Sequence, residues 1–332
     1  MKKSLKNMVA LTGASLLVLA GCAADTPEAP APAPDGQDGP AEVLEGLAQY
    51  DLSGITVTVG SKDFAEQLVL GEVMVAAFEA AGATVNNQVD LGGTNIARSA
   101  LESGDIDIYM EYNGTGWGVH LGIEDAPSFD PDTLTAAVAE RDLAANDIVW
   151  VGQSPFNNTY GFVSSPELTE SNGGPFTLQT MMEYVRDNPD AIVCLESEYP
   201  SRPDGLILME TATGIDLAIS QQRILDTGII YTETAANNCE FGEVYTTDGR
   251  IPALNLTLVD DPGVHFLYNV SGTMRLDKYN EAPEAFDAII NAILNPLDNN
   301  RMADLNTRLA VDGEEPAAVA LAYLLEEGLI KG

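Results

Sequence analysis

Residues 55–110, ITVTVGSKDFAEQLVLGEVMVAAFEAAGATVNNQVDLGGTNIARSALESGDIDIYM, carry the pattern that decides the fold class. Short runs rich in β-branched residues alternate with longer runs whose apolar residues recur at helical spacing, and Gly82 and Gly104 follow the longer runs. These patterns are typical of strands and of helices that end at a glycine. The expected elements are a strand at 55–59, a helix at 64–81, a strand at 84–91, a helix at 94–101 and a strand at 106–110. Their alternation predicts a mostly parallel sheet covered by helices.

The rest of the chain predicts a second α/β unit inserted into the first. The further elements are a helix at 132–145, strands at 148–151, 160–163 and 191–194, helices at 178–186 and from 204, strands at 256–259 and 268–275, and helices to the end. We therefore expect one lobe from residues 50–152 and 252–332 and a second lobe from residues 153–251. Two crossings between lobes make a hinge. Open α/β sheets bind ligands beyond the carboxyl ends of their strands, so we expect a ligand cleft between the lobes.

The N-terminus predicts a lipoprotein signal peptide over residues 1–21. Three lysines precede an apolar run of about a dozen residues, too short to span a bilayer, and the run ends in Leu19-Ala20-Gly21-Cys22. We expect cleavage before Cys22, lipid on its sulfur and an extracytoplasmic protein anchored to the cell membrane. An ordinary signal peptide with a chance cysteine is the alternative. Residues 22–49, rich in Pro and Ala, predict an extended tether.

The two remaining cysteines, Cys194 and Cys239, form an even pair in an oxidising compartment. We expect them to form a disulfide, and two free buried thiols are the alternative. The formal net charge of −36 excludes nucleic acid as a partner, because such a surface repels phosphate. His120 and His265 are the only histidines and neither lies near other metal-ligand types. We therefore expect no metal. No nucleophile elbow or phosphate-binding loop occurs, which excludes a hydrolase of that type and the ATPase of a transporter, and we expect no catalytic residue. We also expect no cofactor and a monomer.

Aromatic and cationic residues stand beside turns in several segments: GSKDFAEQ (60–67), LGGTNIARSALESGDIDIYMEYNGTGWG (91–118), PFNNTYGF (155–162), RPDG (202–205) and VYTTDGRI (244–251). In their order and spacing these segments resemble the glycine betaine, carnitine and choline-binding proteins of osmoprotectant ABC importers. The resemblance implies a two-lobed type II periplasmic-binding-protein fold. It also implies a membrane permease and an ATPase as partners.

The resemblance implies that a box of tyrosines holds the trimethylammonium head of the ligand. Carried over by motif, the box consists of Tyr112, Tyr160, Tyr245 and Tyr268, with Tyr231 as a rival for one wall. A carboxylate clamp is implied at Lys62, Thr115 and Arg202, and Gln67 and Asn158 are further candidates for polar contacts.

The chemistry of the ligand agrees with such a box. A quaternary ammonium group has no N–H to donate, whereas aromatic faces stabilise a desolvated cation by ~0.5–2 kcal/mol each. A carboxylate tail suits a bidentate arginine. An amino acid or a polyamine on the same fold is an alternative ligand, and it would need Glu111 or Asp204 opposite its ammonium group. A secreted enzyme or a sensory module is a further alternative, and Arg202 has the alternative of a surface ion pair with Asp204.

Overall fold

The computed structural model describes residues 46–123 and 125–331. The expected signal peptide, the lipidated Cys22 and residues 22–45 of the expected tether lie outside the described residues. Residues Gly46–Gln49 form a short 3-10 helix, in which Leu47 is 1% exposed and donates its amide to the Leu329 carbonyl at 2.8 Å. The expected end of the tether at residue 49 is therefore wrong, because Leu47 is an apolar anchor on the folded body. Among the described residues, none of the helices has the length and hydrophobicity that a membrane crossing requires.

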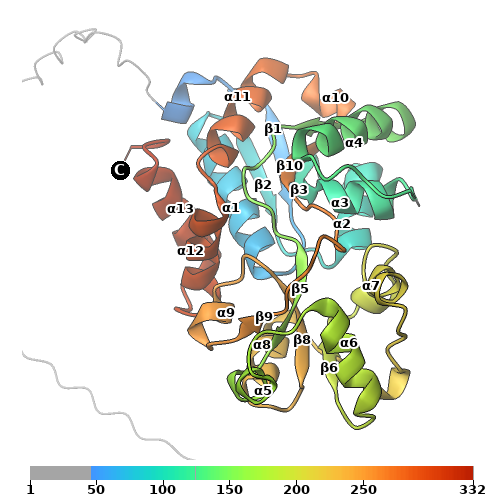
Figure 1. Cartoon of the computed structure of the whole chain (residues 1–332). Coiled ribbons are helices and arrows are strands. Elements are labelled where there is room, and N and C mark those ends of the chain that lie inside the picture. Colours follow the sequence, from blue (N-terminus) through green and yellow to red (C-terminus); the bar gives the residue numbers. More distant parts are fainter. Residues whose placement is uncertain (1–45, 124, 332) are drawn as a thin grey trace, which may run out of the picture. The chain divides into compact units, whose positions relative to one another are not determined.

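The first lobe is built on a five-stranded sheet in the order β2-β1-β3-β10-β4. In Figure 1 this lobe is the upper of the two bodies. Its strands are β1 (Thr56–Gly60), β2 (Thr84–Gln88), β3 (Ile108–Tyr112), β4 (Ile148–Val151) and β10 (Val270–Arg275). Strand β1 is parallel to β2 and β3, whereas β10 is antiparallel to its neighbours β3 and β4. The helices are α1 (Ala65–Ala80), α2 (Thr94–Ser103), α3 (Asn113–Thr115), α4 (Pro131–Asn146), α10 (Leu276–Tyr279), α11 (Pro283–Leu294), α12 (Asn299–Ala310) and α13 (Pro316–Glu326), with a π turn at Gly116–His120.

Helix α1 shows how the sequence builds this lobe. Apolar residues occur on most of its circumference, and they are buried because strands cover one side of the helix while α12 and α13 pack on another. The chain leaves the helix through Gly82, whose φ of 91° is a backbone conformation that favours glycine. The helix begins directly after the loop that follows β1, so its first residues lie at the carboxyl end of that strand.

The second lobe is built on a five-stranded sheet in the order β7-β6-β8-β5-β9. Its strands are β5 (Tyr160–Ser164), β6 (Val193–Leu195), β7 (Gln222–Ile224), β8 (Phe241–Tyr245) and β9 (Thr257–Leu258). Its helices are α5 (Pro166–Asn172), α6 (Leu178–Asp187), α7 (Leu206–Thr213), α8 (Thr227–Ala235) and α9 (Arg250–Ala253), with 3-10 turns at Tyr199–Ser201 and Ile219–Gln221. The expected return to the first lobe at residue 252 is wrong, because β9 still pairs with β5 of the second sheet. We call residues 160–258 the second lobe.

Two crossing segments, residues 152–159 and 259–269, form the hinge between the lobes. They run beside each other and are joined by hydrogen bonds from the Asn158 amide to the Tyr268 carbonyl at 3.1 Å and from the Ser154 amide to the Val270 carbonyl at 2.7 Å. The buried Asn269 side chain donates to the carbonyls of Ser154 and Phe156. The hinge therefore consists of two irregular segments that are hydrogen-bonded to each other, rather than of two independent linkers.

Cys194 and Cys239 are joined by a disulfide inside the second lobe, with their Cα atoms 5.9 Å apart. Cys194 lies in β6 and Cys239 lies just before β8, the strand that pairs with β6 in parallel. Both residues are fully buried. The bridge fastens two neighbouring strands whose carboxyl ends lead toward the lobe interface.

Candidate ligand-binding site

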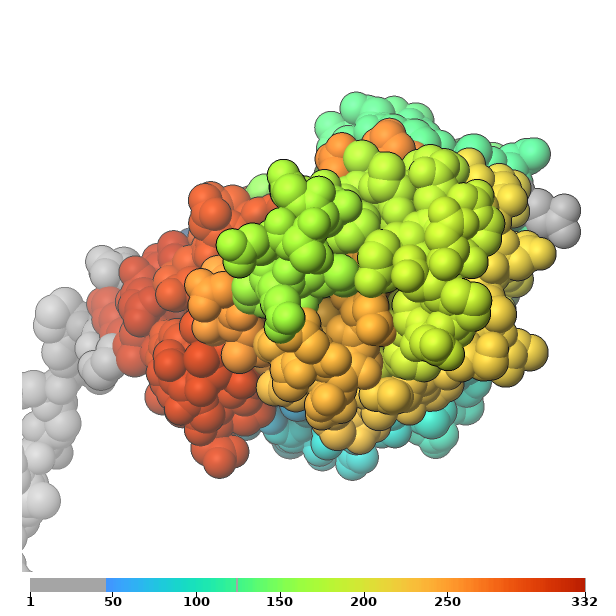
Figure 2. All heavy atoms as spheres, turned by 60° about the horizontal axis from the view of Figure 1, so that its bottom comes forward, coloured from blue at the N-terminus to red at the C-terminus, as the bar shows by residue number. Residues whose placement is uncertain are grey.

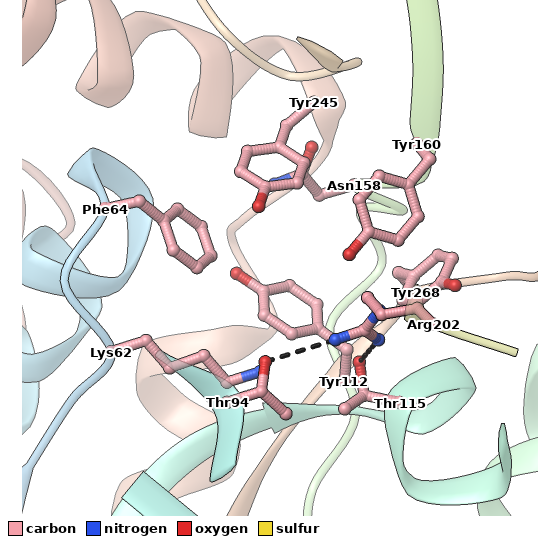
Figure 3. Close-up of a pocket in the computed structure, with 10 residues that line it drawn as sticks. All are labelled: Lys62, Phe64, Thr94, Tyr112, Thr115, Asn158, Tyr160, Arg202, Tyr245 and Tyr268. Atoms are coloured by element: carbon pink, nitrogen blue, oxygen red, sulfur yellow. Dashed lines mark hydrogen bonds between the residues drawn. The ribbon is translucent and has the colours of Figure 1, made fainter. Parts of the chain in front are cut away.

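A cavity lies between the lobes, with about 320 Å³ of empty space when the part open to solvent is included. Residues from the first lobe, the hinge and the second lobe line it, as Figure 3 shows: Lys62, Phe64, Thr94, Tyr112, Thr115, Asn158, Tyr160, Arg202, Tyr245 and Tyr268. Tyr112, Tyr160 and Tyr268 are each at most 6% exposed.

Five aromatic rings close a continuous belt around this cavity. Going round, the ring centroids are 6.2 Å apart from Phe64 to Tyr112, 6.4 Å from Tyr112 to Tyr268, 5.4 Å from Tyr268 to Tyr160, 5.6 Å from Tyr160 to Tyr245 and 4.9 Å from Tyr245 back to Phe64. Burial raises the pKa of each of the four tyrosines well above its ordinary value. The rings therefore stay neutral, and their negative faces attract cations. Two protein cations already lie near them, Lys62 Nζ at 5.1 Å from the ring centroid of Tyr112 and Arg202 Cζ at 5.5 Å from that of Tyr160.

Strand ends place these rings. Tyr112 is the last residue of β3, and Tyr160 and Tyr245 are a directly opposed pair at one end of the antiparallel strands β5 and β8. Tyr268 lies on the second crossing of the hinge. Phe64, the residue that precedes α1, was not predicted from the sequence. Its signal was an aromatic side chain in the loop directly after the first strand, the same context that identified Tyr112.

Arg202 and two threonines form the polar end of the cavity. Arg202 donates from Nη1 to Thr94 Oγ1 at 3.2 Å and from Nη2 to Thr115 Oγ1 at 3.3 Å, the two dashed contacts in Figure 3. Arg202 Nε and Nη2 also form a bidentate pair with Asp204 at 2.9 and 2.7 Å, and Nη1 lies 3.3 Å from Glu198 Oε2. The Tyr268 hydroxyl donates to the Asp204 carboxylate as well. Arg202 is thus both paired with Asp204 and exposed to the cavity, rather than a surface residue. Thr94 was not among the predicted residues.

Lys62 occupies the other side of the polar end and is neutralised from behind. Its ammonium group lies 2.7 Å from Glu111 Oε1, and the second oxygen of Glu111 lies 2.8 Å from His120 Nε2 and accepts from the Tyr109 hydroxyl. Burial would raise the pKa of Glu111, but Lys62 and His120 more than offset this and hold the pKa far below its usual range. The carboxylate is therefore ionised and fully engaged.

Two of the predicted residues do not line the cavity. Tyr231 packs behind Tyr245, and the Tyr231 hydroxyl accepts a hydrogen bond from the backbone amide of Tyr245 at 3.1 Å. The Arg250 guanidinium lies 4.2 Å from the ring centroid of Tyr231. Tyr231 is therefore not a wall of the belt. Gln67 stands behind Tyr112 and donates to its hydroxyl at 3.1 Å. Asn158 does line the cavity, but its amide group already donates to Glu66 and accepts from the Thr247 amide.

Two α/β lobes, a hinge of two crossings and an aromatic cavity between them define a solute-binding protein of the type II periplasmic fold. The chain belongs to the family described as the substrate-binding domain of the ABC-type glycine betaine transport system, whose model matches residues 55–326. This family consists of binding components of ABC transporters, which act outside the cytoplasm with a permease and an ATPase, and it is not an enzyme family.

Individual relatives agree with this assignment. The chain is 30% identical over 296 residues to the glycine-betaine-binding protein of Pseudomonas aeruginosa, covering 86% of this chain and 91% of the relative. Among solved structures, apo YehZ from Escherichia coli is 28% identical with a TM-score of 0.60, covering 83% of this chain and 99% of that one. A glycine betaine/carnitine/choline ABC transporter structure, 22% identical with a TM-score of 0.65 over 82% of this chain and 98% of that one, shares the fold.

Proposed function

We propose that this chain captures a small betaine, with glycine betaine as the reference ligand, and delivers it to the permease of an ABC importer. The observation that carries the proposal is the belt of five aromatic rings next to a polar end that holds the Lys62 ammonium group and the Arg202 guanidinium group. Relatives named as glycine-betaine-binding proteins support it. The belt would hold the trimethylammonium group, and the polar end would receive the carboxylate.

An amino acid or a polyamine is a poorer match to this cavity. Its ammonium group needs a carboxylate that is free to accept hydrogen bonds. Glu111 and Asp204, the expected candidates, do not line the cavity and already bind Lys62 and Arg202. A cavity lined by aromatic faces and without a free carboxylate favours a cation that has no N–H groups. We accordingly propose binding and delivery, without a catalytic step.

The experiment that tests this function is a calorimetric titration of the purified protein with glycine betaine, choline, carnitine, proline betaine and ectoine. The decisive control is 3,3-dimethylbutanoate, which replaces the nitrogen of glycine betaine by carbon and so keeps the shape and the carboxylate but loses the positive charge. We expect saturable binding of glycine betaine and at least roughly tenfold weaker binding of the isostere, since aromatic faces recognise the charge. Equal binding of the two compounds would remove the cation cage.

We further propose that the protein is a monomer held at the membrane by lipid on Cys22, with the Pro-rich segment after it as a spacer. The support is the sequence Leu19-Ala20-Gly21-Cys22 behind a short apolar run. Replacing Cys22 by Ser should move the protein from the membrane fraction to the soluble fraction without changing ligand affinity. Light scattering of the soluble form should give the mass of a single chain.

A further inference from the structure

A buried carboxylate with no cationic partner among the groups it contacts lies directly behind the aromatic belt. Glu66, in the first turn of α1, is 2% exposed and does not line the ligand cavity. One of its oxygens accepts from the Tyr112 hydroxyl at 2.8 Å and from Asn158 Nδ2 at 2.9 Å. The other accepts from Thr247 Oγ1 at 2.7 Å and from Asn306 Nδ2 at 3.1 Å. Four neutral donors therefore share one carboxylate.

These donors come from all three parts of the body. Tyr112 and Asn306 belong to the first lobe, as Glu66 does, and Asn158 lies on the first crossing of the hinge. Thr247 belongs to the second lobe, where it follows β8 and Tyr245. The Thr247 carbonyl also accepts from Asn306 Nδ2 at 3.1 Å. Glu66 thus joins a ring of the cage, the hinge and the second lobe at one point.

The hydrogen bonds of Glu66 make this junction sensitive to lobe position. Burial raises the pKa of Glu66 above its ordinary value, although the hydrogen bonds from its neighbours, that from Thr247 first among them, act in the opposite direction. If the second lobe moved away, Thr247 would leave and one oxygen would retain only Asn306. A buried carboxylate that loses a donor is destabilised, because its hydrogen-bonding capacity is no longer satisfied. The closed arrangement is therefore the one that satisfies Glu66.

The backbone next to Thr247 fits the first lobe just as closely. A side chain on Gly249 would clash with the Thr307 side chain and come within 2.8 Å of its Cα atom on α12. Figure 2 shows the orange segment of the second lobe lying directly against the red C-terminal helices. Gly249 has φ −65° and ψ −17°, a helical conformation open to any residue. Its lack of a side chain is therefore required by the lobe contact and not by the local backbone.

We propose that Glu66 is a positioning residue that couples the cage to lobe closure. It orients the Tyr112 hydroxyl from behind the cage and accepts the Thr247 hydroxyl when the second lobe closes, while Gly249 permits the approach to α12. A ligand that settles against Tyr112 therefore favours the same arrangement that completes the bonds of Glu66, and this coupling slows ligand release.

The test compares Thr247→Val with the matched control Thr246→Val. The Thr246 amide donates to the Thr159 carbonyl, but the Thr246 side chain makes no hydrogen bond within the described part of the chain. The first readout is stopped-flow kinetics of glycine betaine, which rests on the proposed function. Hydrogen bonds to a charged group contribute about 1.5–3 kcal/mol, so Thr247→Val should raise the dissociation rate roughly 10- to 100-fold. Association should change little, since encounter precedes closure. Glu66→Gln and Gly249→Ala should act in the same direction, and Thr246→Val should match the wild type.

The second readout is hydrogen exchange of the ligand-free protein, which needs no assumption about the ligand. Thr247→Val should speed exchange in residues 246–250 and 303–308 and leave the sheet of each lobe unchanged. A wild-type protein that binds no quaternary ammonium compound refutes the proposed function, and exchange alone then decides on the coupling. Identical exchange in the Thr247→Val and Thr246→Val proteins overturns the role of Glu66. Where glycine betaine binds, a dissociation rate of Thr247→Val equal to that of Thr246→Val overturns it as well.

Discussion

Removing Arg202 together with its partner Asp204 should separate betaines from choline as ligands. Arg202 cannot be removed alone, because Asp204 is fully buried and would keep only the Tyr268 hydroxyl. Breaking a buried ion pair by taking away one partner typically destabilises a protein by about 3–5 kcal/mol. The double variant Arg202→Met with Asp204→Asn removes both charges, leaves the net charge of the site unchanged and retains an acceptor for Tyr268.

The magnitude follows from the donors that Arg202 presents to the cavity. Two of its N–H groups point to Thr94 and Thr115 at 3.2 and 3.3 Å, contacts long enough to yield to a ligand carboxylate. Losing such a charged partner costs about 2–5 kcal/mol, which is roughly a 30-fold or larger loss in glycine betaine affinity. Choline offers only a hydroxyl at this end. It should therefore lose about 1 kcal/mol, the net contribution of a neutral hydrogen bond.

Calorimetric titration of both ligands into the variant is the assay. The matched control is Arg186→Met with Asp187→Asn, an exposed pair of the same residue types in the same lobe with an Nε–Oδ1 distance of 2.8 Å. The control should bind both ligands as the wild type does. Equal losses for glycine betaine and choline in the Arg202 and Asp204 variant, with an unchanged melting temperature, would show that the carboxylate is held elsewhere.

The other predictions concern the cage, a buried acid and the disulfide. Replacing Tyr160 by Ala should weaken glycine betaine binding roughly tenfold, whereas Tyr160→Phe should bind nearly as the wild type does. Tyr112→Phe should lose affinity, because the Tyr112 hydroxyl donates to a buried carboxylate. Equal losses for the two phenylalanine variants in a fluorescence titration would contradict this. Burial and a neighbouring glutamate raise the pKa of Glu243 well above 4.5, so the folded state holds its proton more tightly and loses stability as the pH rises above that value. The unfolding free energy of Glu243→Gln should therefore match that of the wild type near pH 4 and exceed it at pH 8. The same difference between the two proteins at both pH values would refute the reasoning. Replacing both Cys194 and Cys239 by Ala should lower the unfolding free energy by about 2–4 kcal/mol in urea titrations, and an unchanged midpoint would show that the bridge does not stabilise the lobe.

Features that depend on local sequence were predictable. The first three strands and two helices follow directly from periodicity, and Tyr112 and Tyr160 were identified because they stand beside turns at strand ends. In contrast, strand β8 was not predicted, since Gly242 and Glu243 interrupt its apolar pattern. Gly242 is needed there because a side chain would clash with Thr234 of α8, a contact that no local pattern reveals.

Features that depend on partners distant in the sequence were not predictable. Lys62 was expected to wait for a ligand carboxylate, yet Glu111, 49 residues away, already binds it. The position of β9 was missed for a related reason, because two residues carry too little pattern to show which sheet they join. Phe64 was passed over because a single aromatic residue near a helix start is most often part of a core.

The central position of β10 has a consequence for the order in which this chain folds. The second lobe is one continuous segment and can complete its sheet as soon as residue 258 is available. The first sheet stays split until β10, translated after the whole second lobe, inserts between β3 and β4. Contacts between such distant segments form slowly, because a long loop must close first. Strand β10 directly follows the second crossing, so the step that completes the first sheet also pairs the two crossings. A folding intermediate with a finished second lobe would therefore still lack the hinge.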